Sequence, residues 1–368
     1  MTAAAAIPEA VEDDDEVRLE IAMLTDPGLV REKNEDSLAV VELDRGLRRL
    51  EDVRQHALGA RGTLLVVCDG MGGAAAGEFA SQLGTDSVLA EVEAYPPTSD
   101  VARRGRQLRT ATRVANRRIV TAARWDPARQ GMGTTLTAAW VARGPDGPSV
   151  LCSQVGDSRA YLVRKGEIGR LTRDQSLAEQ LLQQGHVSAE EAKIFERIGI
   201  ILQALGASED VQPDFTLAPL ARGDVLLLCS DGLSGCVADE EMLTIVESAQ
   251  DLQSAAAALV ARARQSGAPD NVTTVLARVV GPGAGDVDIP AAEAYSPFDL
   301  GEAAHDPLPE PAERPARDPA RFDVGAQRYP KERVAPPPPE TRPGAAQRGL
   351  VALAVLAVVT VGVLWLAL

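Results

Sequence analysis

The sequence has 368 residues, of which 45% are hydrophobic and 3% aromatic, so it can bury a core in one large domain or two ordinary ones. Its formal net charge of −16 argues against a nucleic-acid-binding protein, because phosphate backbones are bound by concentrated Lys and Arg. The four cysteines form no C-x-x-C pair, which fits reduced thiols in a cytosolic domain rather than disulfides or a zinc site.

Residues 1–17 are predicted to form an acidic, disordered tail, because they carry "EDDDE" and no basic residue. They do not resemble a secretory signal, which opens with a basic segment. Residues 18–280 are predicted to form one globular domain. Val-, Leu- and Thr-rich runs predict strands at 19–24, 37–43, 63–68, 134–142, 149–155, 160–164, 224–229 and 271–280, and helical patterns cover 77–92, 101–124, 239–248 and 250–266. The strands cluster at the two ends of the domain, which favours an α+β layered fold with antiparallel sheets over a doubly wound parallel sheet.

Five aspartates stand at predicted strand ends or in tight turns: Asp36, Asp69, Asp157, Asp231 and Asp270. Taken singly, each fits an ordinary turn residue, since Asp-Gly and Asp-Asn are common turn dipeptides. Brought together at one sheet edge, their carboxylates would repel one another unless a cation neutralised them. Mg²⁺ and Mn²⁺ prefer such oxygen ligands, and a pair of these ions can activate water for in-line displacement at phosphorus.

A phosphate group would also need a cationic side chain. Arg31 lies five residues before Asp36 and is the natural candidate, although a plain surface arginine fits its spacing equally well. Other phosphate chemistries are excluded by the motifs. "GMGGAAAGEF" lacks the Lys and Ser/Thr of a P-loop, and no cysteine has an arginine six residues later. Ser158 in "GDSRAY" has no apparent histidine partner, which disfavours a serine hydrolase.

The C-terminal quarter of the chain differs from the domain. Residues 281–348 hold 14 of the 24 prolines and are predicted to form a linker. Residues 349–368 contain no charge, and a helix of that length spans about 30 Å, one bilayer core, so a transmembrane anchor is favoured over a buried core helix. Residues 314–348 carry eight basic and four acidic side chains, which places the linker and the domain in the cytosol.

Six stretches occur in an order that resembles one known family: "TDPGLVREKNEDS", "VVCDGMGGAAAGEFAS", "GMGTTLTAAWV", "QVGDSRAYLVRKGEIGRLTRDQS", "LLLCSDGLSG" and "PDNVTTVLARV". The chain is similar over about residues 20–280 to the metal-dependent protein Ser/Thr phosphatases, the protein phosphatase 2C family, in its bacterial branch. The resemblance implies a four-layer α-β-β-α sandwich with two central antiparallel sheets and a site for two Mn²⁺ or Mg²⁺ ions, with a possible third.

The resemblance also implies roles for residues of this chain. A metal-bridging hydroxide is expected to attack phosphoserine or phosphothreonine of phosphorylated proteins directly. The protein is expected to oppose a bacterial membrane Ser/Thr kinase or to act on the substrates of that kinase. A catalytically silent phosphoprotein-binding regulator is the alternative, and its expected mark would be a lost metal aspartate. By motif position, the implied ligands of the two metals are Asp69, the Gly70 carbonyl, Asp231 and Asp270, and Asp36 (with Glu35) contributes through waters. Asp157 with Asp231 is implied to form the third metal site, and Arg31 to bind the phosphate.

The chain departs from the family pattern near the expected site. Met71 stands where many eukaryotic relatives carry a histidine proposed as general acid, so the leaving group would be protonated by a metal-bound water or another group. Gln175 and Gln203 replace a frequent His and Arg. Residues 176–206 are expected to form a flap beside the site, where substrate selection is expected. Because this segment departs from the family pattern, the resemblance does not predict which protein is the substrate.

Overall fold

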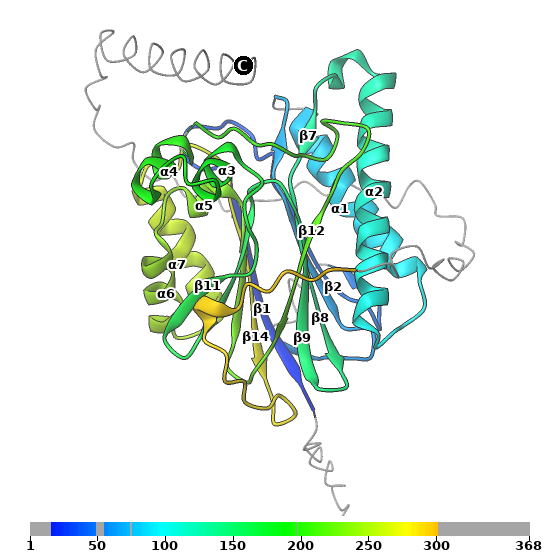
Figure 1. Cartoon of the computed structure of the whole chain (residues 1–368), viewed down its shortest axis with the longest axis vertical. Helices are drawn as coiled ribbons and strands as arrows, with labels where there is room; N and C mark the ends of the chain where they lie inside the picture. The colour runs from blue at the N-terminus through cyan, green and yellow to red at the C-terminus, as the bar shows by residue number, and fades with distance from the viewer. Residues whose placement is uncertain (1–15, 49–54, 74–75, 197, 301–368) are drawn as a thin grey trace, which may run out of the picture. The chain divides into compact units, whose positions relative to one another are not determined.

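The computed structural model describes residues 16–48, 55–73, 76–196 and 198–300. The chain divides into two units, Met1–Pro315 and Ala316–Leu368, and every described residue belongs to the first. In that unit two six-stranded antiparallel sheets lie face to face, with helices on both outer faces (Figure 1). The predicted α+β fold with an α-β-β-α sandwich is therefore confirmed.

Both sheets are built from antiparallel neighbours, and the first and last long strands of the domain pair side by side. The first sheet has the order β11 (Glu167–Arg170), β10 (Arg159–Arg164), β13 (Val225–Cys229), β14 (Val272–Val280), β1 (Arg18–Asp26) and β4 (Gln55–Ala57). The second has the order β12 (Asp214–Pro219), β9 (Gly147–Val155), β8 (Leu136–Gly144), β5 (Thr63–Cys68), β2 (Ser37–Glu42) and β3 (Leu47–Arg48). A short ribbon joins β6 (Gly70–Met71) to β7 (Gly133–Thr134).

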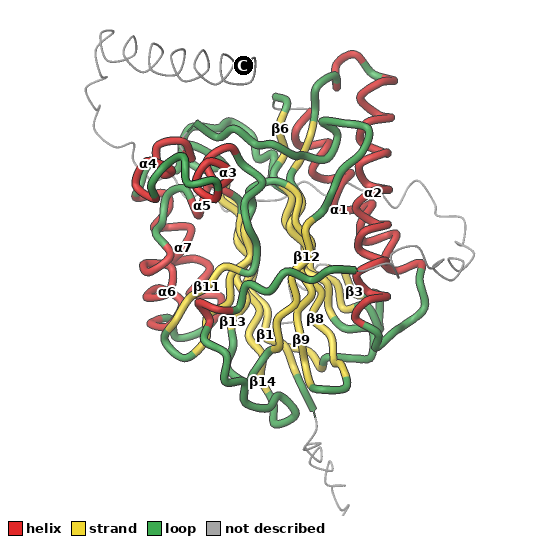
Figure 2. Tube along the Cα trace, viewed as in Figure 1, coloured by secondary structure: helices red, strands yellow, loops and turns green. Residues whose placement is uncertain are grey.

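The helices flank the strands on either side (Figure 2). The second sheet is covered by α1 (Ala76–Ala94) and α2 (Val101–Trp125), which is followed by the short η1 (Pro127–Arg129). The first sheet is covered by α5 (Asp231–Ser234), α6 (Asp239–Ser248) and α7 (Leu252–Gln265). Two further helices, α3 (Leu177–Gln183) and α4 (Ala189–Glu196), lie between β11 and β12 in the chain, and η2 (Ala291–Glu293) follows β14.

Strand β5 shows why its sequence is apolar at every position. Side chains alternate across a strand, and both faces of β5 are buried. Leu64 and Val66 pack in the cluster beneath the α1–α2 layer, whereas Leu65 and Val67 pack in the cluster between the two sheets. The strand therefore ends on a rigid, fully enclosed platform, immediately before Asp69.

Helix α2 is amphipathic and begins at a capping residue. Asp100 accepts a hydrogen bond from the backbone N–H of Arg103 at 3.1 Å, which satisfies one of the free donors of the first turn. Leu108, Ala115 and Ile119 recur at helical spacing and are fully buried against the sheet. The outer face of this helix is rich in arginine.

Residues 281–300, which the sequence analysis assigns to the linker, pack on the domain. The backbone N–H of Leu217 donates to the carbonyl of Ser296 at 3.1 Å, and that of Phe298 donates to Phe215 at 2.8 Å. Leu300 is 8% exposed and lies against Gly105 of α2. The prolines of this stretch predict a linker, but its backbone forms hydrogen bonds along β12. The packed body, meaning the folded domain with this segment, therefore extends to residue 300.

No helix within the described ranges is long and apolar enough to cross a membrane. The predicted anchor, residues 349–368, and most of the predicted tail and linker lie outside those ranges.

Candidate active site

The five predicted aspartates lie at ends of strands where the two sheets meet. The register pairs Ser37 of β2 with Cys68 of β5, so the residue before β2 and the residue after β5 reach the same edge. On the other sheet, Cys229 of β13 pairs with Thr274 of β14, which brings the end of β13 close to the start of β14. The carboxylates at these positions are Asp36 and Asp69 on one sheet, Asp231 and Asp270 on the other, and Asp157 between β9 and β10, where the chain crosses from sheet to sheet.

The carboxyl groups affect one another's protonation, which shows that the structure brings them together. Burial raises the pKa of Asp69 well above its ordinary value, and the charges of the other four aspartates raise it further. Burial and the charges of Asp231 and Asp174 raise the pKa of Asp157 to about 7. Burial and Asp270 raise the pKa of Asp231, partly offset by a hydrogen bond to Asp69. The cluster is therefore strongly disfavoured in its fully ionised form.

Asp36 is held by two hydroxyl groups from the opposite sheet. Its Oδ2 accepts hydrogen bonds from Thr273 Oγ1 at 2.6 Å and from Ser230 Oγ at 2.8 Å. Burial raises the pKa of Asp36 to about 7, although these two hydrogen bonds lower it. Because the hydroxyls hold one oxygen, the other oxygen has a fixed direction.

The backbone of Asp69 is fixed by β7 and the residue that follows it. Its N–H donates to Thr135 Oγ1 at 2.9 Å, and its carbonyl accepts from Thr134 Oγ1 at 2.8 Å. Thr135 Oγ1 also lies 2.7 Å from Ser158 Oγ, which connects this corner to the residue after Asp157. The Asp69 carboxylate consequently starts from a backbone that is bonded on both sides.

The glycines that follow Asp69 and Asp231 are required by close backbone contacts rather than by an unusual φ. A side chain at residue 70 would put its Cβ 2.3 Å from the carbonyl oxygen of Gly77 and 2.5 Å from that of Glu35. A Cβ at residue 232 would lie 2.0 Å from the carbonyl oxygen of Asn271. Both distances are far inside van der Waals contact, so only glycine lets these segments converge at the site.

Arg31 reaches the same corner. Its Nη2 donates to Asp270 Oδ2 at 2.7 Å, and the side chains are 50% and 32% exposed, respectively. Asn271, which the sequence analysis did not single out, holds the Arg31 loop in place. Its Oδ1 accepts from the N–H of Glu35 at 2.7 Å, and its Nδ2 donates to the carbonyls of Lys33 and Pro27 at 2.8 and 3.1 Å.

The donor set fits a hard divalent cation. Oδ1 of Asp36, Asp157 and Asp231 is enclosed by protein and accepts no hydrogen bond, a costly arrangement for a carboxylate oxygen unless an ion completes it. Within the described ranges, however, no three Asp, Glu, His or Cys side chains are close enough to surround one ion, and Asp270 is paired with Arg31. The predicted ligands therefore share one region without forming a closed coordination sphere.

The expected flap contains α3 and α4 and is joined to the site by a buried arginine. Arg159 binds Asp174 through both Nε (3.0 Å) and Nη2 (2.6 Å), and its Nη2 also donates to Glu196 of α4 at 3.1 Å. Gln175 accepts from the N–H of Gly156 at 3.1 Å and donates to Asp214 at 2.8 Å. Gln175, at the position of a frequent His, thus has a structural role here.

The cysteines take no part in the site. All four are free; burial raises the pKa of Cys68, Cys152 and Cys229 to about 12, and Cys236 is half-buried. This agrees with the predicted reduced thiols and leaves no cysteine activated as a nucleophile.

The sequence did not predict a supporting role for several residues that hold the site in place: Thr134, Thr135, Ser158, Ser230, Asn271 and Thr273. A signal was present, since each lies within three residues of a predicted aspartate or in "GTT". Hydroxyl residues are nevertheless so common in strands and turns that their position alone does not distinguish them.

A family model described as Protein phosphatase 2C matches residues 45–280. The serine/threonine protein phosphatase PstP of Mycobacterium tuberculosis is 39% identical over 264 residues, covering 71% of this chain and 45% of that protein. The serine/threonine phosphatase stp of Listeria welshimeri is 34% identical over 255 residues, covering 68% of this chain and 92% of that protein. The chain thus spans less than half the length of the mycobacterial relative.

Solved structures are similar as well. The catalytic domain of PstP, in complex with two manganese ions, superposes with a TM-score of 0.58 at 37% identity, covering 72% of this chain and 99% of that one. Stp1 from Staphylococcus aureus superposes with a TM-score of 0.63 at 32% identity, covering 72% and 96%. These solved chains consist almost entirely of the matched domain, so a domain of this extent folds without further sequence.

Proposed function

This chain belongs to the protein phosphatase 2C family, and on that premise we propose that it hydrolyses phosphoserine and phosphothreonine in proteins with Mn²⁺ or Mg²⁺. The observation that carries the proposal is the group of enclosed, unbonded carboxylate oxygens on Asp36, Asp157 and Asp231, beside a half-exposed arginine. The family relationship and the manganese-bound relative support the same chemistry.

We assign the metal ligands from motif position and from these oxygens. Asp69, the Gly70 carbonyl, Asp231 and Asp270 would hold two such ions, and Asp36 would act through water. Asp157 with Asp231 would hold a third ion. When bound, such ions supply a nucleophile from water at neutral pH and stabilise charge at phosphorus.

The chain's own groups would orient the substrate. Arg31 would bind phosphoryl oxygens, since only its Nη2 is used by Asp270 and a guanidinium offers a second donor edge. Thr134 and Thr135 would keep the Asp69 backbone fixed while charge at the site changes. Met71 has no proton to give, so the leaving oxygen must be protonated by another group.

The test uses the fragment 1–300, which contains the whole packed body. It should hydrolyse p-nitrophenyl phosphate and a phosphothreonine peptide with Mn²⁺, and activity should fall to background with a chelator or with Asp69→Ala. Asp146→Ala, in the β8–β9 turn, is the control for a lost surface carboxylate. Undiminished hydrolysis in both the chelated and the Asp69→Ala samples would refute the metal mechanism.

We further propose that residues 301–348 form a linker and residues 349–368 a single membrane anchor, with the catalytic domain in the cytosol. The uncharged 20-residue stretch and the basic excess before it support this arrangement. Anchoring would concentrate the domain near membrane-bound phosphoproteins, such as a Ser/Thr kinase or its substrates. Protease added outside intact cells should leave the domain uncut, and digestion there would contradict the orientation.

A catalytically silent regulator is not favoured, because every predicted metal aspartate is present and five carboxyl groups interact at one corner. Loss of one of them would have been the expected mark of that alternative.

A further inference from the structure

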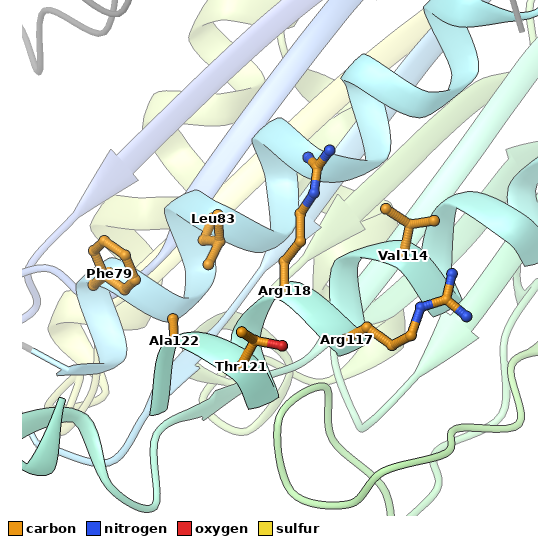
Figure 3. Close-up of a pocket in the computed structure, with 7 residues that line it drawn as sticks. All are labelled: Phe79, Leu83, Val114, Arg117, Arg118, Thr121 and Ala122. Carbon is orange, nitrogen blue, oxygen red and sulfur yellow. The ribbon is translucent and has the colours of Figure 1, made fainter. Parts of the chain in front are cut away.

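An open groove runs along the outer surface between α1 and α2 (Figure 3). It has a volume of about 450 Å³ and a largely apolar floor. Two of its residues come from α1 and the others from α2. Phe79, Leu83, Val114 and Ala122 form its floor, and Arg117 and Arg118 are its charged groups.

The groove begins close to the catalytic corner. Gly77, the second residue of α1, lies against Gly70, and Phe79 follows only two residues later. A helix rises 1.5 Å per residue, so the path from Gly77 to Leu83 covers about 9 Å. Arg129 also contacts the Phe79 ring, and its guanidinium carbon lies 3.6 Å from the ring centroid. A substrate chain leaving the corner over α1 would therefore meet the groove almost at once.

The groove is cationic although the chain as a whole is acidic. Helix α2 contains eight arginines and no acidic residue, in a chain of net charge −16. Arg117 is exposed and makes no ion pair with a described residue, and Arg118 donates only to Ser87 Oγ at 3.2 Å. Elsewhere on α2, Arg113 and Arg124 are paired with Asp210 and Glu209, and the acidic residues of α1 do not line the groove.

We propose that this groove binds an acidic segment of the phosphoprotein substrate that carries one large apolar side chain. The apolar side chain would lie on the Phe79–Leu83–Val114 floor, and neighbouring carboxylates would pair with Arg117 and Arg118. An extended peptide advances about 3.3 Å per residue, so the path of about 9 Å from Gly77 to Leu83 corresponds to about three residues of substrate, and the segment should lie at least that far from the phosphoresidue. The inference rests on the proposed phosphatase function and adds to it a substrate class selected by a second contact.

The experiment compares two phosphothreonine peptides with fragment 1–300 and Mn²⁺. One carries a leucine flanked by aspartates four residues from the phosphothreonine, and the other carries glycine and asparagines there. Wild-type protein should prefer the acidic peptide by about tenfold in kcat/KM, mainly through KM, as expected for two partly exposed ion pairs plus an apolar contact. Arg117→Glu with Arg118→Glu should abolish that preference while p-nitrophenyl phosphate hydrolysis stays within about twofold.

Two controls keep the test decisive. Arg103→Glu makes the same kind of charge reversal about 21 Å along α2 from Arg117 and should keep the preference. Val114→Trp fills the floor without changing charge and should raise KM for the acidic peptide alone. Binding of the labelled, unphosphorylated peptides, measured by fluorescence anisotropy with chelator present, tests the groove without catalysis.

The proposal is overturned if the double reversal and Val114→Trp both retain the wild-type preference. It is equally overturned if the double reversal weakens sedimentation with phosphatidylglycerol vesicles but leaves peptide kinetics and binding unchanged, because the surface would then serve a membrane. If the wild type hydrolyses neither peptide nor p-nitrophenyl phosphate, the proposed function fails, and the anisotropy difference alone decides whether the groove recognises acidic segments.

Discussion

Replacing Asp36 by asparagine should stabilise the metal-free domain at pH 8 and reduce its response to pH. The pKa of Asp36 is about 7 in the folded chain against 3.8 as its ordinary value, so folding favours the protonated form. The destabilisation is largest above pH 7, where the carboxyl is ionised in both states, and fades as the pH falls toward 4, where it becomes neutral in the unfolded chain as well. Between pH 8 and pH 5.5 the gain from this one group is about 2 kcal/mol. Asparagine carries no charge and keeps an oxygen that can accept from Ser230 and Thr273.

The assay is urea denaturation of fragment 1–300 with a chelator at both pH values. Wild-type protein should be more stable at pH 5.5 than at pH 8, and Asp36→Asn should remove about 2 kcal/mol of that difference. Saturating Mn²⁺ should abolish the benefit of the substitution at pH 8 because the ion then offsets the negative charge. Equal pH dependence in the two proteins, or lower stability of the variant at pH 8 without metal, would show that the ionised Asp36 carboxylate does not destabilise the metal-free fold.

Three further predictions concern the supports of the site. Gly70→Ala should lower kcat/KM at least about 100-fold, because its Cβ would displace the carbonyls of Gly77 and Glu35; Gly144→Ala, with no contact nearer than 3.6 Å, is the matched control, and equal activity of the two would contradict the argument. Asn271→Ala should cost about 2–4 kcal/mol in urea denaturation, as three hydrogen bonds to loop 27–35 are lost; a loss below 1 kcal/mol would mean that water replaces them. Arg159→Ala should cost about 3–5 kcal/mol by leaving Asp174 buried and unpaired, and Arg159→Met with Asp174→Leu should recover much of it; an unrecovered double variant would argue against the charge explanation.

The long elements were predictable because their patterns are local. Strand β5 is apolar at every position, and α2 repeats buried residues at helical spacing, so both were predicted within two residues of their observed bounds. Strands β3, β6 and β7 are only two residues long, and their existence depends on partners elsewhere in the chain. Periodicity over a window of residues carries no information about such short pairings.

The site was predictable in its charged residues and not in its neutral ones. Aspartates that follow strands stand out, and the charges of the other four raise the pKa of Asp69, while their roles as metal ligands stay predictions. The hydroxyls of Ser230 and Thr273 contact Asp36 from positions 194 and 237 residues away in the chain. The local sequences "CSDG" and "NVTT" do not indicate which of the two sheets will supply the carboxylate that these hydroxyls contact.

The pairing of β1 with β14 has a consequence for how the protein is made. Arg18 lies opposite Val280 and Asp26 opposite Val272, so the opening strand of the domain has no partner on that side until the closing strand has left the ribosome. Asp270 arrives just ahead of the same strand. A nascent or truncated chain that ends before residue 270 therefore lacks both the strand pairing that joins the two ends of the domain and one of the five clustered carboxylates.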